Sequence, residues 1–578
     1  MAPTDQLQEV KIMLHGTAAS EGIGIGKVML IEEHSLEYTP RTVTDTEAES
    51  QRFKAAVDAF CYNTEKQAEN LRSSAGEKEA EILAGHIQII KDPYLSGEIE
   101  KLIADGQCAE SALEHMCDMF IAMFSAADDE LTKQRAADVR DIKSGVLGIL
   151  LGVNEIKVSD APKGTVLVAK ELTPSVTAGI VKENIAGIIT ETGGTTSHSA
   201  ILARALEIPA VLSVEGVASS LKNGDTVVVD GSEGAVIVNP DDNTVAEYSK
   251  KRDAFLAERK ELENYRGRET KSASGEAYEL FCNIGKPEDA VKAVDADGEG
   301  VGLFRTEFLF MDRTSIPTED EQFEAYKKAA LILKGKSLII RTLDIGGDKD
   351  IPYLGLEKEE NPFMGFRAIR YCLKNRELFK SQIKAILRAS AFGDIKIMFP
   401  LITTIDELRE GKKLVAECKA DLRNMDINFN ENIQVGVMVE TASAAVIADM
   451  LAKEADFFSI GTNDLTGYTM ACDRGNNDVS YLYSPLQPSV LRMIKRTIEC
   501  GVQNGISVGM CGEAAANKLM IPLLISFGLT EFSVSAPSVL NVRKIISTWT
   551  KEEADKVTAK VLEMSTQQEI VEYLKSVV

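Results

Sequence analysis

The spacing of apolar residues separates a helical region of the chain from strand-rich regions on either side. Through residues 44–151, apolar residues recur every three or four positions, for example at Phe53, Ala56 and Phe60. This is the period of an amphipathic helix. The segment Thr44–Glu47 has the Thr-x-x-Glu order of a capping box and marks a helix start. The pattern therefore predicts an all-helical region of four or five helices.

Short apolar runs flank this helical region and are typical of buried strands. The candidates are a Gly-rich turn and strand within 15–31, then Thr165–Ala169, Ile185–Thr190, Asp225–Asp230 and Ala235–Asn239. We therefore predict a small α/β domain formed by residues 1–35 and 152–243, with a helical subdomain of residues 36–151 inserted in it.

From residue 271 to 578 the chain alternates strands and helices with a regular period. The predicted strands are Tyr278–Ile284, Gly302–Phe308, Leu338–Ile345, Ile395–Pro400, Gln434–Glu440, Phe457–Asn463, Val508–Gly512 and Phe532–Ala536. Helical patterns separate them, as in Glu319–Leu333 and Ile405–Asn424. Eight such units in a region of this length predict a (β/α)8 TIM barrel. The expected fold class is therefore multidomain α/β.

A charged stretch joins the two regions. Residues 244–270 are rich in Lys, Glu and Arg, with isolated apolar residues such as Leu256 and Leu262. This composition predicts a solvated linker helix. It would serve either as a passive spacer or as a hinge.

Composition narrows the possible partners. The 578 residues include 64 basic and 89 acidic side chains, which gives a net charge of −25. Binding to nucleic acid or to an anionic membrane requires a basic surface, so neither is expected. No apolar run approaches the length of a membrane span, and the start lacks a secretory signal. We therefore expect a cytoplasmic protein without membrane insertion.

Cysteine and histidine usage limits the metal chemistry. The nine cysteines contain no Cys-x-x-Cys pair, so neither a zinc site nor a disulfide framework is predicted. The five histidines are His15, His34, His86, His115 and His198. A metal in the C-terminal half would need oxygen ligands, which favours Mg²⁺ or Mn²⁺. We expect His86 to be either an interface residue or a surface histidine.

The stretch Gly193–Arg204 links a predicted strand to a predicted helix. A Gly-Gly turn precedes His198, and the Ala/Leu-rich residues from Ala200 to Leu206 predict the helix. His198 would then lie at a helix start, where free N–H groups and the helix dipole favour a phosphate. Two interpretations remain open: His198 carries a phosphoryl group, or it is an incidental turn residue.

In a TIM barrel, the C-terminal ends of the strands carry the active site. Here they offer Arg305, Glu307, Arg341, Asp344, Glu440, Asn463, Asp464, Cys511 and Glu513, with Arg474 soon after the sixth strand. Arginine forks bind phosphate and carboxylate, and a carboxylate pair suits a hard divalent cation. Any one of these residues could belong to a structural ion pair. Together, at five strand ends, they favour a small phosphorylated substrate with several negative charges.

Six ordered motifs give the chain a family resemblance. They are Gly193–His198 with Ala203-Arg204, Gly302–Arg313, Asp344–Lys349, Glu360–Arg370, Phe457–Thr466 and Gly509–Glu513. Over essentially its whole length the chain resembles Enzyme I of the bacterial sugar phosphotransferase system. Enzyme I is a phosphoenolpyruvate–protein phosphotransferase.

The resemblance implies an activity and roles for matching residues. Enzyme I transfers the phosphoryl group of phosphoenolpyruvate to its own histidine, here His198, and then to a histidine of the phosphocarrier protein HPr, releasing pyruvate. Cys511 would protonate the enolate, and Thr177 would support His198. Substrate binding would fall to Arg305, Arg341, Arg367, Asn463, Asp464 and Arg474, and Mg²⁺ binding to Glu440 and Asp464. The resemblance also implies HPr docking on the helical subdomain, a swivelling α/β domain and a homodimer formed through the barrel.

The sequence departs from the family pattern at three positions. Thr195 replaces a usual arginine, Gly467 a usual glutamine, and Cys472 a usual hydrophobic residue. We expect these changes to alter local electrostatics and rates but not the reaction.

Two rival interpretations remain. A pyruvate,phosphate dikinase or phosphoenolpyruvate synthase would need an additional nucleotide-binding domain, and no Gly-x-x-x-x-Gly-Lys-Ser/Thr loop is present. A non-catalytic HPr-binding paralogue is disfavoured by the joint presence of His198, Glu440, Asp464 and Cys511. Without an extra N-terminal sensory domain, the sequence favours the sugar-transport branch over the nitrogen-regulatory one.

Overall fold

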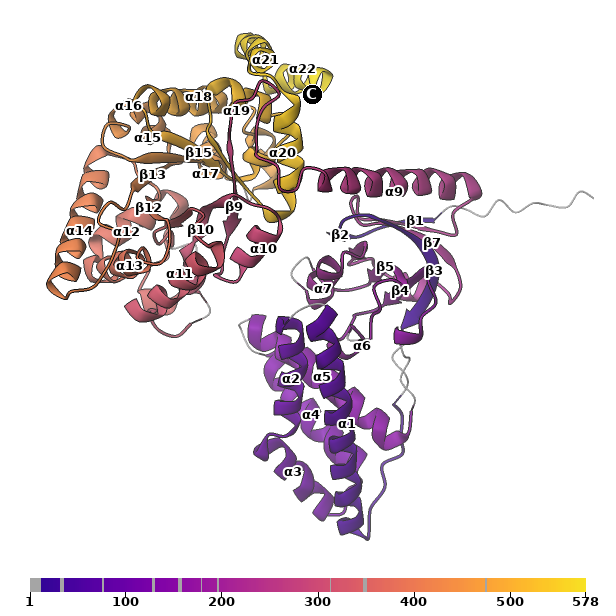
Figure 1. The fold of residues 1–578 in the computed structure, drawn as a ribbon. Coiled ribbons are helices and arrows are strands. Elements are labelled where there is room, and N and C mark those ends of the chain that lie inside the picture. The colour runs from indigo at the N-terminus through magenta and orange to yellow at the C-terminus, as the bar shows by residue number, and fades with distance from the viewer. Residues whose placement is uncertain are drawn as a thin grey trace, which may run out of the picture. The chain divides into compact units, whose positions relative to one another are not determined.

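The structure is a computed structural model in which the chain divides into two compact units. It describes residues 12–31, 36–74, 77–126, 130–153, 158–177, 179–194, 197–311, 313–346, 351–473 and 476–578. Unit 1 comprises Met1–Arg259 and unit 2 comprises Lys260–Val578. One long helix, α9 (Asp242–Glu263), runs across the boundary between them (Figure 1).

Unit 1 contains an eight-stranded mixed sheet with the order β1-β8-β7-β3-β4-β5-β6-β2. Its strands are β1 (Ile12–His15), β2 (Thr17–Ser20), β3 (Ile23–Ile31), β4 (Thr165–Ala169), β5 (Ile185–Thr190), β6 (Ala210–Leu212), β7 (Thr226–Asp230) and β8 (Ala235–Val238). The helices α6 (Pro174–Thr177), α7 (His198–Leu206) and α8 (Val217–Ser220) lie in the connections between them. Strands β3, β4, β5 and β6 pair in parallel, so the carboxyl ends of β4 and β5 lie at the same edge of the sheet.

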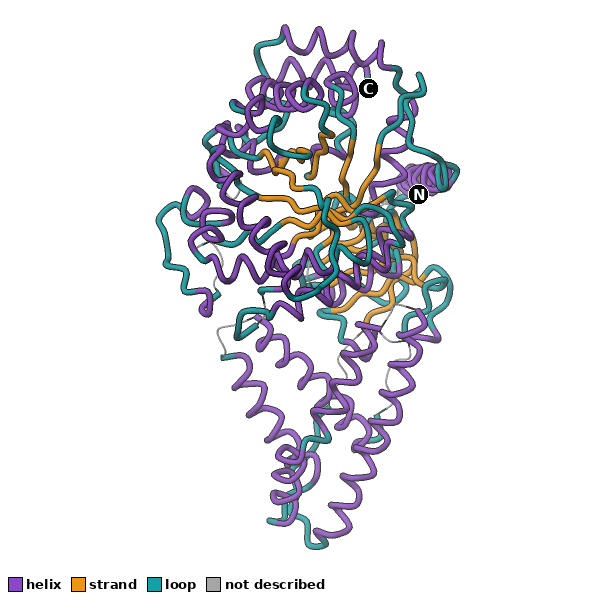
Figure 2. The backbone as a smooth tube through the Cα atoms, turned by 60° about the vertical axis from the view of Figure 1, so that its left-hand side comes forward, coloured by secondary structure: helices purple, strands orange, loops and turns teal. Residues whose placement is uncertain are grey.

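Five helices form the part of unit 1 between β3 and β4. They are α1 (Thr46–Ser74), α2 (Glu77–Ile90), α3 (Pro93–Ala104), α4 (Ala109–Ser125) and α5 (Glu130–Leu151). Figure 2 shows this part of unit 1 as a bundle of helices. Phe53, Leu113 and Val146 meet in their shared core. The predicted capping box is wrong, because α1 begins at Thr46 and the Asp45 carboxylate accepts the Ala48 N–H at 3.0 Å.

His86 is neither a surface nor an exposed interface residue, which contradicts both expectations. Its side chain is buried, 1% exposed, against helix α5. His86 Nε2 lies 3.3 Å from Asp138 Oδ1, and Nδ1 lies 3.8 Å from Asp141 Oδ2. The two aspartates provide polar partners, which allows a polar ring to be buried in the bundle.

Unit 2 is a closed barrel of eight parallel strands, which confirms the predicted TIM barrel. The strands are β9 (Glu279–Ile284), β10 (Gly300–Arg305), β11 (Leu338–Arg341), β12 (Ile395–Phe399), β13 (Val435–Val439), β14 (Phe457–Gly461), β15 (Ser507–Cys511) and β16 (Glu531–Val534). The helices cover the outer face of the barrel and side chains from the strands fill its interior, so both faces of each strand are covered and its residues are mostly apolar. Every residue of β13 and β14 is buried.

The helices of unit 2 fill the connections and follow the last strand. They are α10 (Asp289–Asp295), α11 (Glu319–Leu333), α12 (Ala368–Lys374), α13 (Arg376–Ala389), α14 (Ile405–Asn424), α15 (Ala442–Val446), α16 (Ala448–Leu451), α17 (Thr462–Met470), α18 (Pro488–Gln503), α19 (Ile521–Phe527), α20 (Val539–Thr548), α21 (Lys551–Glu563) and α22 (Gln567–Val577). A short 3-10 helix, η2 (Thr306–Leu309), follows β10 directly.

The linker helix is shorter than predicted at its C-terminal end. Helix α9 stops at Glu263, and the residues after it are bound to the barrel by the fully buried Arg543 of α20. Arg543 donates to the Tyr265 carbonyl at 3.1 Å and to Thr270 Oγ1 at 3.0 Å. The segment 264–270 is thus part of unit 2.

Among the described residues, no helix combines the length and the apolar character needed to cross a membrane.

Candidate active site

In unit 1, the turn between β5 and α7 leads to His198. Gly193 has a φ of +106°, a conformation that L side chains rarely adopt, and a Cβ there would lie 3.1 Å from Ser197 Oγ. Ser197 caps α7, and its Oγ accepts the Ala200 N–H at 3.3 Å. His198 is therefore the first residue of a nine-residue helix, where unpaired backbone N–H groups favour an anion.

Two other predicted residues lie near α7 in the same unit. Thr177 ends α6, is 1% exposed, and belongs to a helix that packs against α7. Arg204, on α7, donates to the Ala19 carbonyl at 3.1 Å and so fixes the helix to β2. Thr195 lies outside the described residues.

In unit 2, two buried arginines share one carboxylate at the C-terminal end of the barrel. Asp344 Oδ2 lies 2.8 Å from Arg341 Nη1, and Asp344 Oδ1 lies 2.7 Å from Arg367 Nη2. Glu307 Oε1 lies 2.6 Å from Arg341 Nη2, and Asp464 Oδ2 lies 3.4 Å from Arg367 Nη2. Burial lowers the pKa of both guanidinium groups, but the nearby carboxylates outweigh it and raise each pKa above its usual value.

Three carboxylates meet beside these arginines. Oxygen atoms of Asp344, Glu440 and Asp464 all lie within 4.8 Å of one another. Burial, and then the charges of Asp464 and Asp344, raise the pKa of Glu440 to about 8. Glycine at 461 leaves room for this cluster, because a Cβ there would lie 2.7 Å from Glu440 Oε2. Like charges this close repel unless a proton or a cation compensates them, so the donor set fits a divalent cation.

Cys511 ends β15 and is 4% exposed. Ser459 Oγ donates to its Sγ at 3.4 Å, and Sγ donates to the Ile460 carbonyl at 3.8 Å. Burial raises the pKa of the thiol to about 11. Cys511 therefore remains protonated at neutral pH and can donate a proton.

The remaining predicted site residues differ in their placement. Arg305 ends β10 and is exposed, as expected for a side chain at the rim. Asn463 and Asp464 were predicted to end the sixth strand, but β14 stops at Gly461 and both belong to the first turn of α17. Arg474 lies outside the described residues.

The structure adds residues to which the sequence analysis gave no role. Asp344 links the two arginines, whereas the sequence analysis placed it at a strand end without an individual role. Tyr468, four residues after Asp464 on α17, has its hydroxyl 3.5 Å from Arg367 Nη1. Its one-turn spacing from Asp464 is the signal that could have indicated it.

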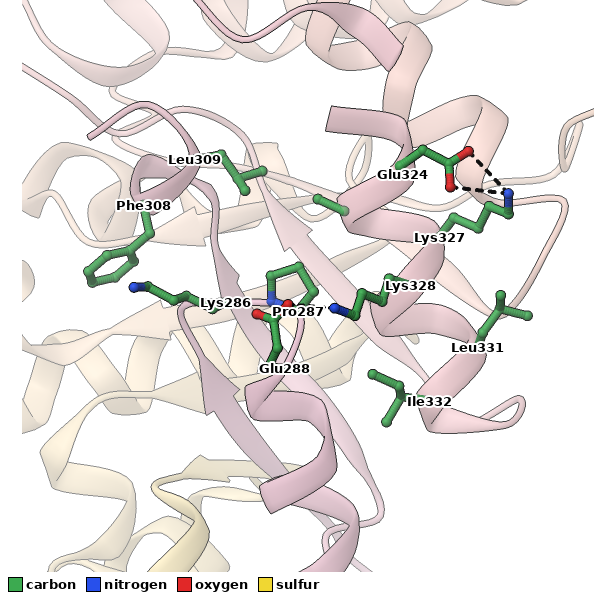
Figure 3. Close-up of a pocket in the computed structure, with 11 residues that line it drawn as sticks. Lys286, Pro287, Glu288, Phe308, Leu309, Glu324, Lys327, Lys328, Leu331 and Ile332 are labelled. Atoms are coloured by element: carbon green, nitrogen blue, oxygen red, sulfur yellow. Dashed lines mark hydrogen bonds and ion pairs between the residues drawn. The ribbon is translucent and has the colours of Figure 1, made fainter. Parts of the chain in front are cut away.

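A pocket of about 890 Å³ opens on the flank of the barrel (Figure 3). It lies between the β9–α10 connection, the end of η2 and helix α11, and it is lined by Pro287, Phe308, Leu309 and Leu331. Its lysines are partly neutralised, since Lys328 pairs with Glu288 at 2.7 Å and Lys327 with Glu324 at 3.1 Å. Its lining contains none of the predicted site residues, so it is distinct from the candidate active site.

Comparison with known sequences assigns the chain to a family. Family models described as the PEP-binding, N-terminal and mobile domains of PEP-utilising enzymes match residues 259–550, 15–135 and 161–234. The phosphoenolpyruvate-protein phosphotransferase of Bacillus subtilis (strain 168) is 46% identical over 570 residues, covering 98% of this chain and 99% of that protein. The chain belongs to the phosphoenolpyruvate–protein phosphotransferase family.

Further members of the phosphoenolpyruvate–protein phosphotransferase family are equally similar. The proteins of that name from Listeria innocua and Priestia megaterium are each 45% identical, covering 97% of this chain and 98% of the relative. The protein is thus an enzyme of this family, and the resemblance to Enzyme I is confirmed.

Proposed function

We propose that the protein transfers the phosphoryl group of phosphoenolpyruvate to His198 and then to a histidine of HPr, releasing pyruvate. The observation that carries this proposal is the cluster of Arg341, Arg367 and three carboxylates, two members of which, Arg341 and Glu440, act electrostatically on the thiol of Cys511. A phosphorylated carboxylic acid with a carbon to be protonated is the substrate that such a set of side chains suits. Family membership supports the same reaction.

In the first half-reaction, the arginines hold phosphoenolpyruvate and neutralise its charge. Arg305, Arg341 and Arg367, with Asn463 and Arg474, bind its phosphate and carboxylate oxygens. A ring nitrogen of neutral His198 attacks phosphorus, the bond from phosphorus to the enol oxygen breaks, and the enolate remains. The thiol of Cys511 gives its proton to the methylene carbon, which completes pyruvate.

Glu440 and Asp464, with Asp344 beside them, would hold Mg²⁺, and Mn²⁺ suits the same oxygen donors. The bound ion would supply Lewis-acid neutralisation of phosphate charge. Asp344 keeps Arg341 and Arg367 oriented toward the same place, so the substrate meets preorganised charges.

In the second half-reaction, His198 passes its phosphoryl group to HPr. Because His198 and the barrel cluster belong to different compact units, we propose that the α/β domain of residues 1–35 and 152–243 swivels, with hinge motion in the 244–270 linker. The helical subdomain of residues 36–151 would dock HPr, and Thr177, on α6 beside α7, would support His198. The family resemblance supports a homodimer formed through the barrel domain of residues 271–578, the sugar-transport branch and a cytoplasmic location.

The test is phosphorylation of the purified protein by phosphoenolpyruvate labelled in its phosphate, with Mg²⁺ and HPr present. We expect His198→Ala to abolish both self-labelling and labelling of HPr, because no acceptor nitrogen remains. His15→Ala is the matched control, an exposed histidine of the same unit, and should behave like the parent. Label retained on the His198→Ala protein would refute the assignment.

A further inference from the structure

A buried glutamine behind the candidate active site connects two of its strands. Gln382 lies on α13 and is 0% exposed. Its Oε1 accepts the N–H of Leu343 at 2.9 Å, and its Nε2 donates to Thr306 Oγ1 at 3.1 Å. Nε2 also donates to the hydroxyl of Tyr326, on α11, at 3.2 Å. One amide thus bridges the ends of β10 and β11 and a covering helix.

The direction of each hydrogen bond in this network is determined. A backbone N–H only donates, so the atom facing Leu343 must be the amide oxygen. The Thr306 hydroxyl donates to the Arg341 carbonyl at 2.8 Å, which leaves its lone pair for the Gln382 NH₂ group. The Tyr326 hydroxyl donates onward to Gln322 Oε1 at 3.3 Å. The hydrogen-bond network around Gln382 therefore has two branches. One runs through Thr306 and Leu343 to the strand ends, and the other runs through Tyr326 away from them.

The branch toward the strand ends begins where the backbone hydrogen bonding between β10 and β11 stops. Strand β11 ends at Arg341, and register pairing between β10 and β11 ends with Arg305 opposite Arg341. Beyond that pair, side chains replace the hydrogen bonds between the strand backbones. Gln382 accepts the Leu343 N–H, and the Thr306 hydroxyl donates to the Arg341 carbonyl. Thr306 directly follows Arg305, Leu343 directly precedes Asp344, and the Thr306 hydroxyl binds the carbonyl of Arg341. The amide thus fixes the backbone from which those three side chains project.

We infer that Gln382, acting through Thr306 and Leu343, is a positioning residue for the phosphorylation of His198 by phosphoenolpyruvate. The inference rests on the proposed function. Gln382 reaches the site through other residues and does not itself touch a reacting atom. Its effect follows from preorganisation, because a displacement of about 1 Å in a binding group can reduce a rate on the order of 100-fold.

The two branches provide a matched pair of variants. Thr306→Val keeps the side-chain shape and removes the hydroxyl of the strand-end branch. Tyr326→Phe keeps the ring, which stacks edge-on against Phe304, and removes the hydroxyl of the other branch. Both positions are 0% exposed, and each change deletes one bond from Gln382 Nε2. A merely structural role for the network predicts similar effects from both variants.

The experiment measures kcat and KM for pyruvate formation from phosphoenolpyruvate, transfer from phosphorylated HPr to His198, and the thermal midpoint. We expect Thr306→Val and Gln382→Met each to lower kcat/KM for the phosphoenolpyruvate step by about tenfold or more, the scale of one lost buried hydrogen bond. Tyr326→Phe should leave kcat/KM unchanged while shifting the thermal midpoint as much as Thr306→Val does. Transfer from phosphorylated HPr should be unaffected in all three.

A double variant completes the test. Because Thr306 and Gln382 act in one chain of bonds, Thr306→Val combined with Gln382→Met should be no slower than the worse single variant. Equal losses in Thr306→Val and Tyr326→Phe, or additive losses in the double variant, would overturn the role of Gln382. If Gln382→Met fails to fold, the Thr306 and Tyr326 pair decides the question alone. A parent protein that does not react with phosphoenolpyruvate would instead refute the proposed function.

Discussion

Glu531 is a buried acid of the barrel interior that the proposed reaction does not use. It begins β16, is 5% exposed, and its Oε1 has no hydrogen-bond partner among the described residues. Glycines make space for it, since a Cβ at Gly302 or Gly509 would lie 2.5 or 2.8 Å from that oxygen. Burial, and then the charge of Glu279, raise the pKa of Glu531 to about 8.

This raised pKa makes the stability of the barrel depend on pH. Unfolded chains ionise a glutamate near pH 4.5, whereas the folded protein keeps Glu531 protonated until about pH 8. The folded state therefore loses stability as pH rises across that interval. We expect Glu531→Gln to raise the free energy of unfolding on the order of 3 kcal/mol at pH 8 and to change it little at pH 5, measured by urea titration.

The control for this prediction is Glu563→Gln, which changes an exposed carboxyl at the end of α21. It should leave the unfolding free energy unchanged at both pH values. A Glu531→Gln effect of equal size at low and high pH would mean that shape, not ionisation, determines the stability.

The residues at the site differ in how far sequence could predict them. Cys511 and Glu440 were predictable because a barrel strand places its C-terminal residue at the mouth, whatever its neighbours are. The bridging role of Asp344 was not, because it depends on Arg367, which arrives from a loop many residues later. Gln382 gives no sequence signal either, since a buried glutamine on α13 looks like any polar helix residue. Pairing across elements is a property of the folded chain.

Arg543 attaches the segment after α9 to the barrel. It donates to the Tyr265 and Asp297 carbonyls at 3.1 and 2.8 Å, and it also pairs with the Asp297 carboxylate. An arginine that is 2% exposed and has this many partners holds the segment in one conformation. Hinge motion in the 244–270 linker should then arise in its helical part, which belongs to α9, rather than in residues 264–270.

We expect Arg543→Met to destabilise unit 2 by about 3–5 kcal/mol, because Asp297 would remain partly buried without its cation. The same change should expose residues 264–270 to limited proteolysis. Arg492→Met, at an exposed position of α18, is the control and should do neither. If residues 264–270 of the Arg543→Met protein resist the protease, other contacts are enough to hold this segment on the barrel.

At the level of elements, the sequence predicted every barrel strand to within a few residues, since a doubly covered strand is a continuous apolar run. It failed where tertiary contacts end an element. Strand β10 ends and η2 begins at Thr306, whose hydroxyl donates a hydrogen bond to the Arg341 carbonyl. Strand β6, three residues long, was missed because so short a run carries no periodicity.

The whole molecule keeps its two candidate chemical centres in separate compact units. His198 begins a helix of unit 1, whereas the carboxylate cluster of Asp344, Glu440 and Asp464 lies in unit 2. A divalent cation would therefore serve only the half-reaction that uses phosphoenolpyruvate.

We expect removal of divalent cations with EDTA to stop phosphorylation of His198 by phosphoenolpyruvate and to leave transfer between His198 and HPr intact. Added Mg²⁺ should restore the first reaction. Labelled phosphate followed in each half-reaction separately makes the comparison. Equal sensitivity of both half-reactions to EDTA would contradict a cation requirement confined to unit 2.

The division into two units also has a genetic consequence. Under the proposed function, a lesion in the barrel would leave His198 and its helix intact, and the damaged protein should still exchange phosphate with HPr. A lesion at His198 should leave a barrel that still binds phosphoenolpyruvate. Inactivating mutations should therefore fall into two classes according to the unit they change. Mutations in unit 2 should stop only the reaction with phosphoenolpyruvate, and those at His198 should stop both phosphoryl transfers.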